Sequence, residues 1–239
     1  FKIITKLSPQ GDDQWDKSFL DKWEDDLKRS INLLKINQLE GLLVHKASDL
    51  LRSDSKYLID WLFSLKGKGL VKKLGLSIYN DDQIMNLPLD GFELIQLPLS
   101  IYDQTLLKNG SLKFLRDLGF SIYARSVFLQ GLILQELNFW PSFISNEFKE
   151  HHRKVSEFTK NTNSSLLDLS FDFLVNCQYI DGIVVGLTSV NELESIHKSW
   201  EKSITHKLDL SQNFNQFAWD NVQDIDPRLW ENKQKTNKN

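Results

Sequence analysis

The sequence predicts an α/β protein built around a parallel sheet. About six short apolar runs alternate with segments of helical periodicity, which is typical of strands joined by right-handed helical crossovers. The chain has 239 residues, of which 41% are hydrophobic, so it can bury a core large enough for one domain. Several of the runs also end on a polar residue, where enzymes with parallel sheets keep their chemistry.

The first strand is expected at residues 2–6, followed by a long amphipathic helix. Apolar residues recur every four positions there and form one helix face. These residues are Trp15, Phe19, Trp23, Leu27 and Ile31. Asp12 and Asp13 stand where this helix should begin and can cap it.

A second helix is expected at about residues 53–65. Ser53 or Asp54 can cap it, and Gly67 and Gly69 are signals for its end. The residues predicted to face inward are Leu58, Trp61, Leu62 and Leu65.

The alternation then continues to the end of the chain. Further strands are expected at residues 41–45, 72–77, 92–97, 120–126 and 180–186. Further helices are expected at residues 81–87, 104–118 (closed by Gly119), 145–160, 164–176 and from Ser189 onward. Residues 204–230 carry aromatic side chains that can pack across the sheet, and 231–239 should be a disordered tail.

Composition narrows the class of partner. The net charge of −3 gives no electrostatic reason to expect nucleic acid or an anionic membrane surface. No apolar run approaches the roughly 18 residues of a spanning helix, and the N-terminus lacks a signal-peptide pattern. We therefore expect a soluble, cytoplasmic protein that acts on a small molecule. The sequence does not indicate its oligomeric state.

The single cysteine and the histidines argue against a metal centre. Cys177 alone can form neither an internal disulfide nor a multi-cysteine site, and we interpret it as a buried small hydrophobe. Four histidines have no paired metal-ligand spacing and are expected at the surface. These are His151, His152, His197 and His206.

The chain begins within an apolar run at Phe1, and its only methionine is Met85. We therefore expect it to be the C-terminal portion of a longer natural protein.

Three polar residues end successive predicted strands. Lys6 ends KIITK, His45 ends GLLVH, and Ser77 lies in GLSIY. Taken singly, each is explained by a polar residue at a strand end. Their order resembles the aldo-keto reductases, in which a lysine, a histidine and a G-x-S-N element end the third, fourth and fifth barrel strands.

The resemblance implies a (β/α)8 TIM barrel without its first one or two βα units, in a single domain over residues 1–230. An open doubly wound sheet and a six-stranded, half-closed barrel are the alternatives. The family's catalytic tyrosine and its partner aspartate would then precede Phe1. The tyrosines of this chain that follow other strands cannot take the place of the catalytic one without a different geometry. They are Tyr79, Tyr102 and Tyr123.

The resemblance also assigns catalytic roles to two residues. Lys6 would lower the pKa of the tyrosine that protonates the substrate carbonyl, because a nearby ammonium favours the phenolate. His45 would orient the carbonyl and assist proton delivery, since imidazole can donate from one nitrogen and accept at the other.

Two further residues resemble the site for the nicotinamide carboxamide. Ser77 matches the family serine, but Ile78 replaces the asparagine after it. Gln96 in FELIQLPLS matches the family glutamine, and an amide can pair with an amide in both directions. Without the family, Gln96 is equally well explained by a polar layer inside the barrel.

The run IYARSVFLQGL at 122–132 resembles the family's A-Y-S-P-L-x-x-G-L. Ser126, Gly131 and Leu132 are in register, whereas Arg125 replaces the tyrosine that stacks on the nicotinamide ring. A guanidinium can stack on an aromatic ring but suits a positively charged one poorly. This form is similar to a subgroup associated with bacterial surface-polysaccharide synthesis.

The run GLTSVNELES at 186–195 falls where the family binds the adenosine phosphate at a helix start. The candidate residues are Gly186, Thr188, Ser189 and Glu192. The alternative is that Ser189 and Glu192 form a capping box that satisfies the same N–H groups. A carboxylate at Glu192 would repel a 2′-phosphate, and Ile196 replaces an asparagine near adenine, so the cofactor is NAD or NADP with NAD favoured.

Two functions follow from the resemblance. The first is NAD(P)H-dependent reduction of an aldehyde or ketone, with a sugar-derived carbonyl as substrate. The second is an inactive aldo-keto reductase-like binding or regulatory protein, which the departures at Ile78, Arg125, Glu192 and Ile196 favour.

Overall fold

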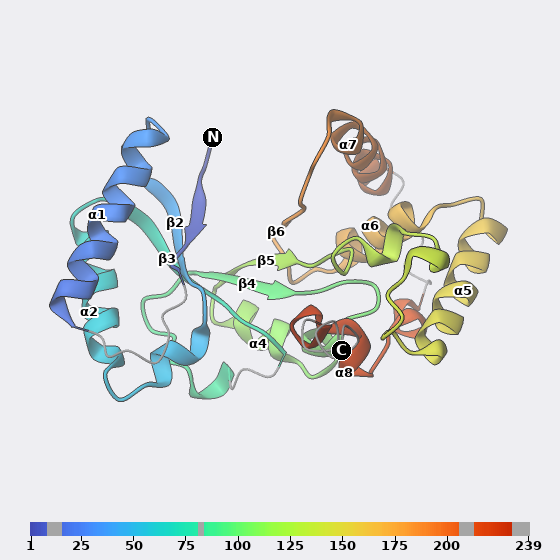
Figure 1. Ribbon diagram of the computed structural model, residues 1–239, viewed down its shortest axis with the longest axis horizontal. Helices are drawn as coiled ribbons and strands as arrows, with labels where there is room; N and C mark the ends of the chain where they lie inside the picture. Colours follow the sequence, from blue (N-terminus) through green and yellow to red (C-terminus); the bar gives the residue numbers. More distant parts are fainter. Residues whose placement is uncertain (9–15, 81–83, 206–212, 231–239) are drawn as a thin grey trace. The chain divides into compact units, whose positions relative to one another are not determined.

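The computed structural model describes residues 1–8, 16–80, 84–205 and 213–230 (Figure 1). Four expectations lie outside these residues: the cap at Asp12 and Asp13, the helical Trp15, His206, and the tail 231–239. The chain divides into two compact units, Phe1–Leu97 with Lys113–Tyr123 and Pro98–Leu112 with Ala124–Asn239. A single barrel over residues 1–230 stays a prediction.

Six strands form one sheet in the described part of the chain, in the order in which they occur in the sequence. They are β1 (Ile4–Lys6), β2 (Leu39–Val44), β3 (Val71–Ser77), β4 (Leu94–Pro98), β5 (Ser121–Arg125) and β6 (Gly182–Ile183). The pairings of β1 with β2, β2 with β3 and β3 with β4 are parallel. The predicted alternation of strands and helices around a parallel sheet is therefore confirmed.

Two helices of the first unit lie along one side of β2 and β3 (Figure 1). The helix α1 (Lys17–Leu33) begins at Asp16, whose carboxylate accepts a hydrogen bond of 2.9 Å from the Phe19 N–H. Helix α2 (Ser55–Gly67) buries the four residues that its pattern predicts. The residue after its C-cap is Gly69, whose φ of 71° is a conformation that favours glycine.

The buried stripe of α1 is shifted from the predicted one. It consists of Leu20, Glu24, Leu27 and Ile31, with Phe19 and Trp23 half-buried beside it. Glu24 can lie in this stripe because Lys68 and Lys28 approach its carboxylate at 2.7 and 2.9 Å. A buried charge is tolerated where it is paired.

Three expected elements are shorter or broken. The helix predicted at 104–118 is divided into α3 (Thr105–Lys108) and α4 (Ser111–Asp117) at Gly110, where φ is 82°. The helix predicted at 81–87 is the 3-10 turn η2 (Ile84–Asn86) in its described part, and β6 spans two residues. A second 3-10 turn, η1 (Ala47–Leu51), follows β2.

The second unit is mainly helical. It contains α5 (Asn146–Asn161), α6 (Leu166–Asn176), α7 (Val190–Thr205) and the short α8 (Val222–Ile225), with 3-10 turns η3 (Leu132–Leu134), η4 (Leu137–Phe139), η5 (Phe214–Phe217) and η6 (Pro227–Leu229). Ser145 and Ser165 cap α5 and α6 by accepting hydrogen bonds from Phe148 and Asp168 N–H groups. None of the described helices is both long and apolar enough to span a membrane.

His152 is buried, so the expectation of a surface histidine is wrong at this position. It is 2% exposed, and its Nδ1 lies 2.8 Å from the hydroxyl of Tyr102, which is fully buried. The Trp140 ring packs over the imidazole at a centroid distance of 4.5 Å. Burial lowers the pKa of His152 to about 4, so the ring is neutral at pH 7. The partners are 50 positions apart, and no spacing in the sequence reveals them.

The C-terminal segment of the second unit is fixed by one buried carboxylate. Asp224 is 1% exposed and accepts hydrogen bonds from the Ser145 N–H and hydroxyl at 3.0 and 2.7 Å. It also accepts from Trp219 Nε1 and Asn221 Nδ2, both at 3.1 Å. These bonds connect the start of α5 to α8.

Candidate active site

The first unit brings Lys6 and Ser77 together. Lys6 is the last residue of β1 and Ser77 the last of β3, and the Lys6 ammonium donates a hydrogen bond of 3.2 Å to the Ser77 hydroxyl. Lys6 is half-buried and Ser77 is 1% exposed. The strand ends therefore place a long cationic side chain beside a buried hydroxyl.

The register places three predicted site residues on one face of the sheet. Lys6 pairs with Leu43, Leu43 with Gly75, and Ser77 with Gln96. Side chains two residues apart on a strand share a face, so Ser77 lies on the face of Gly75. We call this side, which carries Lys6, Ser77 and Gln96, the lysine face. His45 directly follows the end of β2.

Two glycines keep the backbone close on the lysine face. A Cβ on Gly75 would lie 2.5 Å from Leu43 Cδ2, Leu94 Cβ and Leu94 O. A Cβ on Gly41 would lie 2.5 Å from Leu94 Cδ1. Leu43 and Leu94 therefore fill the space that side chains at these positions would need, directly below the polar strand ends.

The residue after Ser77 departs from the family pattern in a way that the structure explains. Ile78 is fully buried, and its N–H donates a hydrogen bond of 2.9 Å to the carbonyl of Gln96. Alternation along the strand directs its side chain away from the lysine face. Ile78 thus belongs to the core and offers no polar group where the family has asparagine.

Asp49 is a buried acid near the same strand end that the sequence analysis missed. It lies in η1, four residues after His45, and is 5% exposed. Burial raises the pKa of its carboxyl, although Lys46 and Arg52 oppose this effect. An aspartate between a predicted strand and a predicted helix is so common that its sequence context gives no signal of burial.

In the second unit, Arg125 ends β5 and Ser126 follows it. Arg125 Nη1 donates a hydrogen bond of 3.4 Å to Ser126 Oγ. Ser126, Leu129 and Gln130 have positive φ values of 57°, 46° and 57°, and Gly131 follows at 86°. Non-glycine residues in this conformation are strained and concentrate at functional sites, which marks this turn as a candidate.

The start of α7 is capped by its own side chains. The Glu192 carboxylate accepts hydrogen bonds from the Thr188 N–H at 2.7 Å and the Thr188 hydroxyl at 2.9 Å. Ser189 Oγ accepts from the Glu192 N–H at 3.2 Å. Hydrogen bonds from Thr188 lower the pKa of Glu192, so it carries a negative charge at neutral pH. The capping interaction is therefore present, with Thr188 N–H in place of Ser189 N–H.

Each unit brings together part of the predicted set. In the first, Lys6 and Ser77 touch, Gln96 shares their face, and His45 follows the end of the neighbouring strand β2. In the second, Arg125 contacts Ser126, with Gly131 in the following turn. Gly186, Thr188, Ser189 and Glu192 form an exposed group at α7. Within the described residues, no group of three histidine, cysteine or acidic side chains is placed to hold a metal ion.

The fold is similar to solved aldo-keto reductases. An aldo-keto reductase from Bacillus halodurans matches in its apo form with a TM-score of 0.64 at 15% identity, covering 90% of this chain and 69% of that one. Its holo form also gives 0.64 at 15% identity, over 88% of this chain and 73% of that one. A thermostable aldo-keto reductase bound to the inhibitor epalrestat gives 0.57 at 17% identity, covering 81% and 64%. The chain thus spans about two thirds of these proteins.

No curated protein sequence matches the chain. The family model described as the aldo/keto reductase family matches residues 1–208. This match covers both polar strand ends that meet in the first unit, and in the second unit the turn after β5 and the start of α7. The chain therefore belongs to the aldo/keto reductase family, a family of oxidoreductases.

Proposed function

We propose that this chain takes part in NAD(P)H-dependent reduction of a small aldehyde or ketone, with a sugar-derived carbonyl as the substrate. The observation that supports this most is the hydrogen bond of 3.2 Å between Lys6 and Ser77. It joins the candidate catalytic lysine to the candidate carboxamide-binding serine at one end of parallel strands, where enzymes with this architecture place their sites.

Each residue has a definite task in this proposal. The Lys6 ammonium stabilises a phenolate and so makes a neighbouring tyrosine a stronger acid. His45 holds the carbonyl oxygen by a hydrogen bond. Ser77 and Gln96 hold the carboxamide of the cofactor, which supplies the hydride when bound. The proposal takes the tyrosine from outside residues 1–239.

The residues fit the two ends of the cofactor unequally. The Ser77 hydroxyl and the Gln96 amide are neighbours on the lysine face and suit a carboxamide. At α7, the Glu192 carboxylate already occupies the Thr188 N–H and adds negative charge where a phosphate would lie. We therefore propose NAD rather than NADP.

Fluorescence titration tests the cofactor assignment. Residues 1–239 should bind NADH more tightly than NADPH by roughly fivefold, because two like charges near 4 Å in water repel by about 1 kcal/mol. Ser77→Ala should weaken the binding of both cofactors, whereas Ser18→Ala, at an exposed serine of α1, should change neither. Tighter binding of NADPH than of NADH would contradict the preference for NAD. If Ser77→Ala bound both cofactors as tightly as the wild type does, Ser77 would not belong to the cofactor site.

Turnover needs the tyrosine, so it is tested in a chain with a D-T-A-x-x-Y-G-like segment ahead of residue 1. That chain should oxidise NADH with aldehydes and sugar-derived ketones. Lys6→Met should lower its kcat by about a hundredfold or more, the usual size of an acid–base contribution. The exposed Lys2 gives the matched control Lys2→Met, which should keep full activity.

A second function is favoured by Ile78 and Glu192. Ile78 is committed to the core and Glu192 to the cap of α7, so two family contacts to the cofactor are missing. An aldo-keto reductase-like protein that binds or regulates without redox turnover would tolerate both changes. Cofactor binding without NADH oxidation in the tyrosine-containing chain would establish this function in place of the first.

A further inference from the structure

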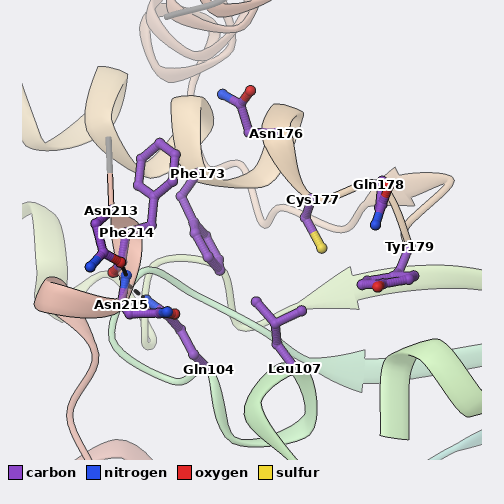
Figure 2. A pocket seen from close by; sticks show the side chains of 10 residues that line it. All are labelled: Gln104, Leu107, Phe173, Asn176, Cys177, Gln178, Tyr179, Asn213, Phe214 and Asn215. Carbon is purple, nitrogen blue, oxygen red and sulfur yellow. Dashed lines mark hydrogen bonds between the residues drawn. The ribbon is translucent and has the colours of Figure 1, made fainter. Parts of the chain in front are cut away.

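The second unit contains a cavity of about 590 Å³ that the proposed reaction does not use (Figure 2). It lies among α3, the end of α6 with the turn before β6, and the start of η5. Its lining residues are Gln104, Leu107, Phe173, Asn176, Cys177, Gln178, Tyr179, Asn213, Phe214 and Asn215. Its volume is in the range of small-molecule sites.

This cavity is separate from the cofactor residues of the same unit. Cys177, Gln178 and Tyr179 precede β6, whereas Gly186 to Glu192 follow it. The lining therefore shares no residue with the candidate cofactor site at the start of α7.

Gln104 supplies an unsatisfied acceptor in the cavity wall. It is 1% exposed, and its Nε2 donates to the carbonyls of Ile101 at 2.8 Å and Phe214 at 2.9 Å. These two acceptors fix the orientation of the amide, because exchanging its nitrogen and oxygen would set oxygen against oxygen. Among the described residues, Gln104 Oε1 has no hydrogen-bond partner. A buried acceptor of this kind needs a donor from water or from a ligand.

Among the residues that the structure describes, the lining combines amides with aromatic rings and carries no acidic or basic side chain. Amides offer donors and acceptors together, as hydroxyl groups do, while an uncharged wall gives no compensation for a phosphate or carboxylate. The rings of Phe173 and Phe214 meet edge to face at 69°. They therefore cannot clamp both faces of a flat heterocycle, but one ring can cover the C–H face of a saturated ring.

We propose that this cavity is a second binding site for an uncharged sugar. The hydroxyls of the sugar pair with the amides, one of its O–H groups donates to Gln104 Oε1, and its C–H face rests on an aromatic ring. Figure 2 shows the Phe173 ring reaching from α6 toward Gln104 and Leu107. This proposal does not depend on the redox function, since none of its residues belongs to the lysine face.

Cys177 provides a specific reporter. It is the only cysteine of the chain, lines the cavity and is 9% exposed, so a maleimide can add only one cysteine adduct, which intact-mass measurement counts. The labelling rate is measured at mildly alkaline pH in the 239-residue chain. The panel contains glucose, galactose, N-acetylglucosamine and trehalose, with glucose 6-phosphate, gluconate, nicotinamide and adenine for comparison.

We expect at least one neutral sugar to slow the labelling of Cys177 in a saturable way, and the charged and flat compounds to leave it unchanged. Gln178→Ala should lower the affinity for the protecting sugar by about fivefold, which is the typical contribution of one neutral hydrogen bond. Gln216→Ala replaces another exposed glutamine, which lies outside the lining, and should leave protection intact. Gln104→Met should abolish the protection of Cys177 by the sugar. If Gln104→Met does not fold, the comparison between wild type and Gln178→Ala still decides the test.

Three results would overturn the proposal. One is the absence of protection by every neutral sugar. Another is protection by nicotinamide or adenine instead, which would make the site one for flat heterocycles. The third is protection of the same strength in wild type and Gln178→Ala.

Discussion

His152 and Tyr102 show how a polar pair becomes part of a core. Each would be costly to bury alone, but each satisfies the other at 2.8 Å inside a cluster of aromatic rings. Burial raises the pKa of Tyr102 well above its usual range and lowers that of His152 to about 4. Both groups are therefore neutral at physiological pH, and the pair carries no charge into the core.

The pKa of His152 predicts a loss of stability in acid. An unfolded histidine binds a proton below its ordinary pKa of 6.5, whereas the folded one binds it only near about 4. The unfolded state therefore holds more protons in this window, and the unfolding free energy should fall as the pH is lowered through it. Urea unfolding at a series of pH values measures the slope.

The histidine variants separate this effect from the titration of other groups. His152→Phe should flatten the slope between pH 6.5 and about 4, even though it leaves the Tyr102 hydroxyl without its partner. His197→Gln, at an exposed histidine of α7, should keep the wild-type slope. Equal slopes in wild type and His152→Phe would show that burial does not govern this titration.

Lys6 and Ser77 were predictable from the sequence because their placement follows from strand ends alone. The C-terminal ends of parallel strands lie at the same edge of a sheet, and the long lysine side chain at the end of β1 can reach past β2 to the end of β3. The burial of His152 depends on a partner in another segment, and that of Asp49 on what surrounds η1. No local pattern of residues indicates the burial of either side chain, which is why neither was predicted from the sequence.

At the scale of elements, apolar periodicity predicted the presence of most helices and strands. It was less successful in predicting where each of them ends. The face of α2 is the predicted one because four large apolar residues determine it. In α1 the shift to Glu24 depends on Lys68, which lies 44 residues away. The helix expected at 104–118 breaks at Asn109 and Gly110, where the loss of helix propensity outweighs the apolar pattern on both sides.

Gly75 predicts how tightly β3 is held between its neighbours. In Gly75→Ala the new Cβ would overlap the backbone and side chain of Leu94 and the side chain of Leu43. The change should cost about 1–3 kcal/mol of unfolding free energy, as overpacking does. Urea titration should show a lower midpoint. A stability equal to wild type would mean that β3 and β4 can separate freely.

Gly67 supplies the matched control. It lies at the end of α2 in a helical conformation, and a Cβ there would meet no atom within 4 Å. Gly67→Ala should leave stability unchanged or raise it by up to about 1 kcal/mol, because alanine favours the helix. A large loss at Gly67 would show that the effect at Gly75 is not one of packing.

At the scale of the molecule, the family fold was predictable because the polar residues that end successive strands occur in the order typical of the family. This order is recognisable although the sequence identity to solved members is low. The division into two compact units was not predictable. It depends on the density of contacts between segments distant in the sequence, which periodicity does not report. Two segments enter units made largely of other parts of the chain, Lys113–Tyr123 in the first and Pro98–Leu112 in the second.

Asp224 predicts how the C-terminal segment contributes to the second unit. Asp224→Ala would leave the Ser145 and Trp219 donors without their acceptor and should lower the unfolding free energy by about 3 kcal/mol. Asp220→Ala removes an exposed carboxylate that pairs with Lys108 and should cost less than about 1 kcal/mol. Tryptophan fluorescence during urea unfolding measures both. Equal losses in the two variants would rule out a special role for Asp224.

The strand order of the sheet also bears on how the chain is made. Among the described strands, each one after β1 pairs with the strand synthesised just before it, so none of them has to wait for a later part of the chain. A ribosome releases the N-terminal elements first, at a pace of several residues each second. As each new strand and its helix leave the exit tunnel, an edge formed earlier is ready to receive them, and the sheet can grow during translation in the direction in which the message is read.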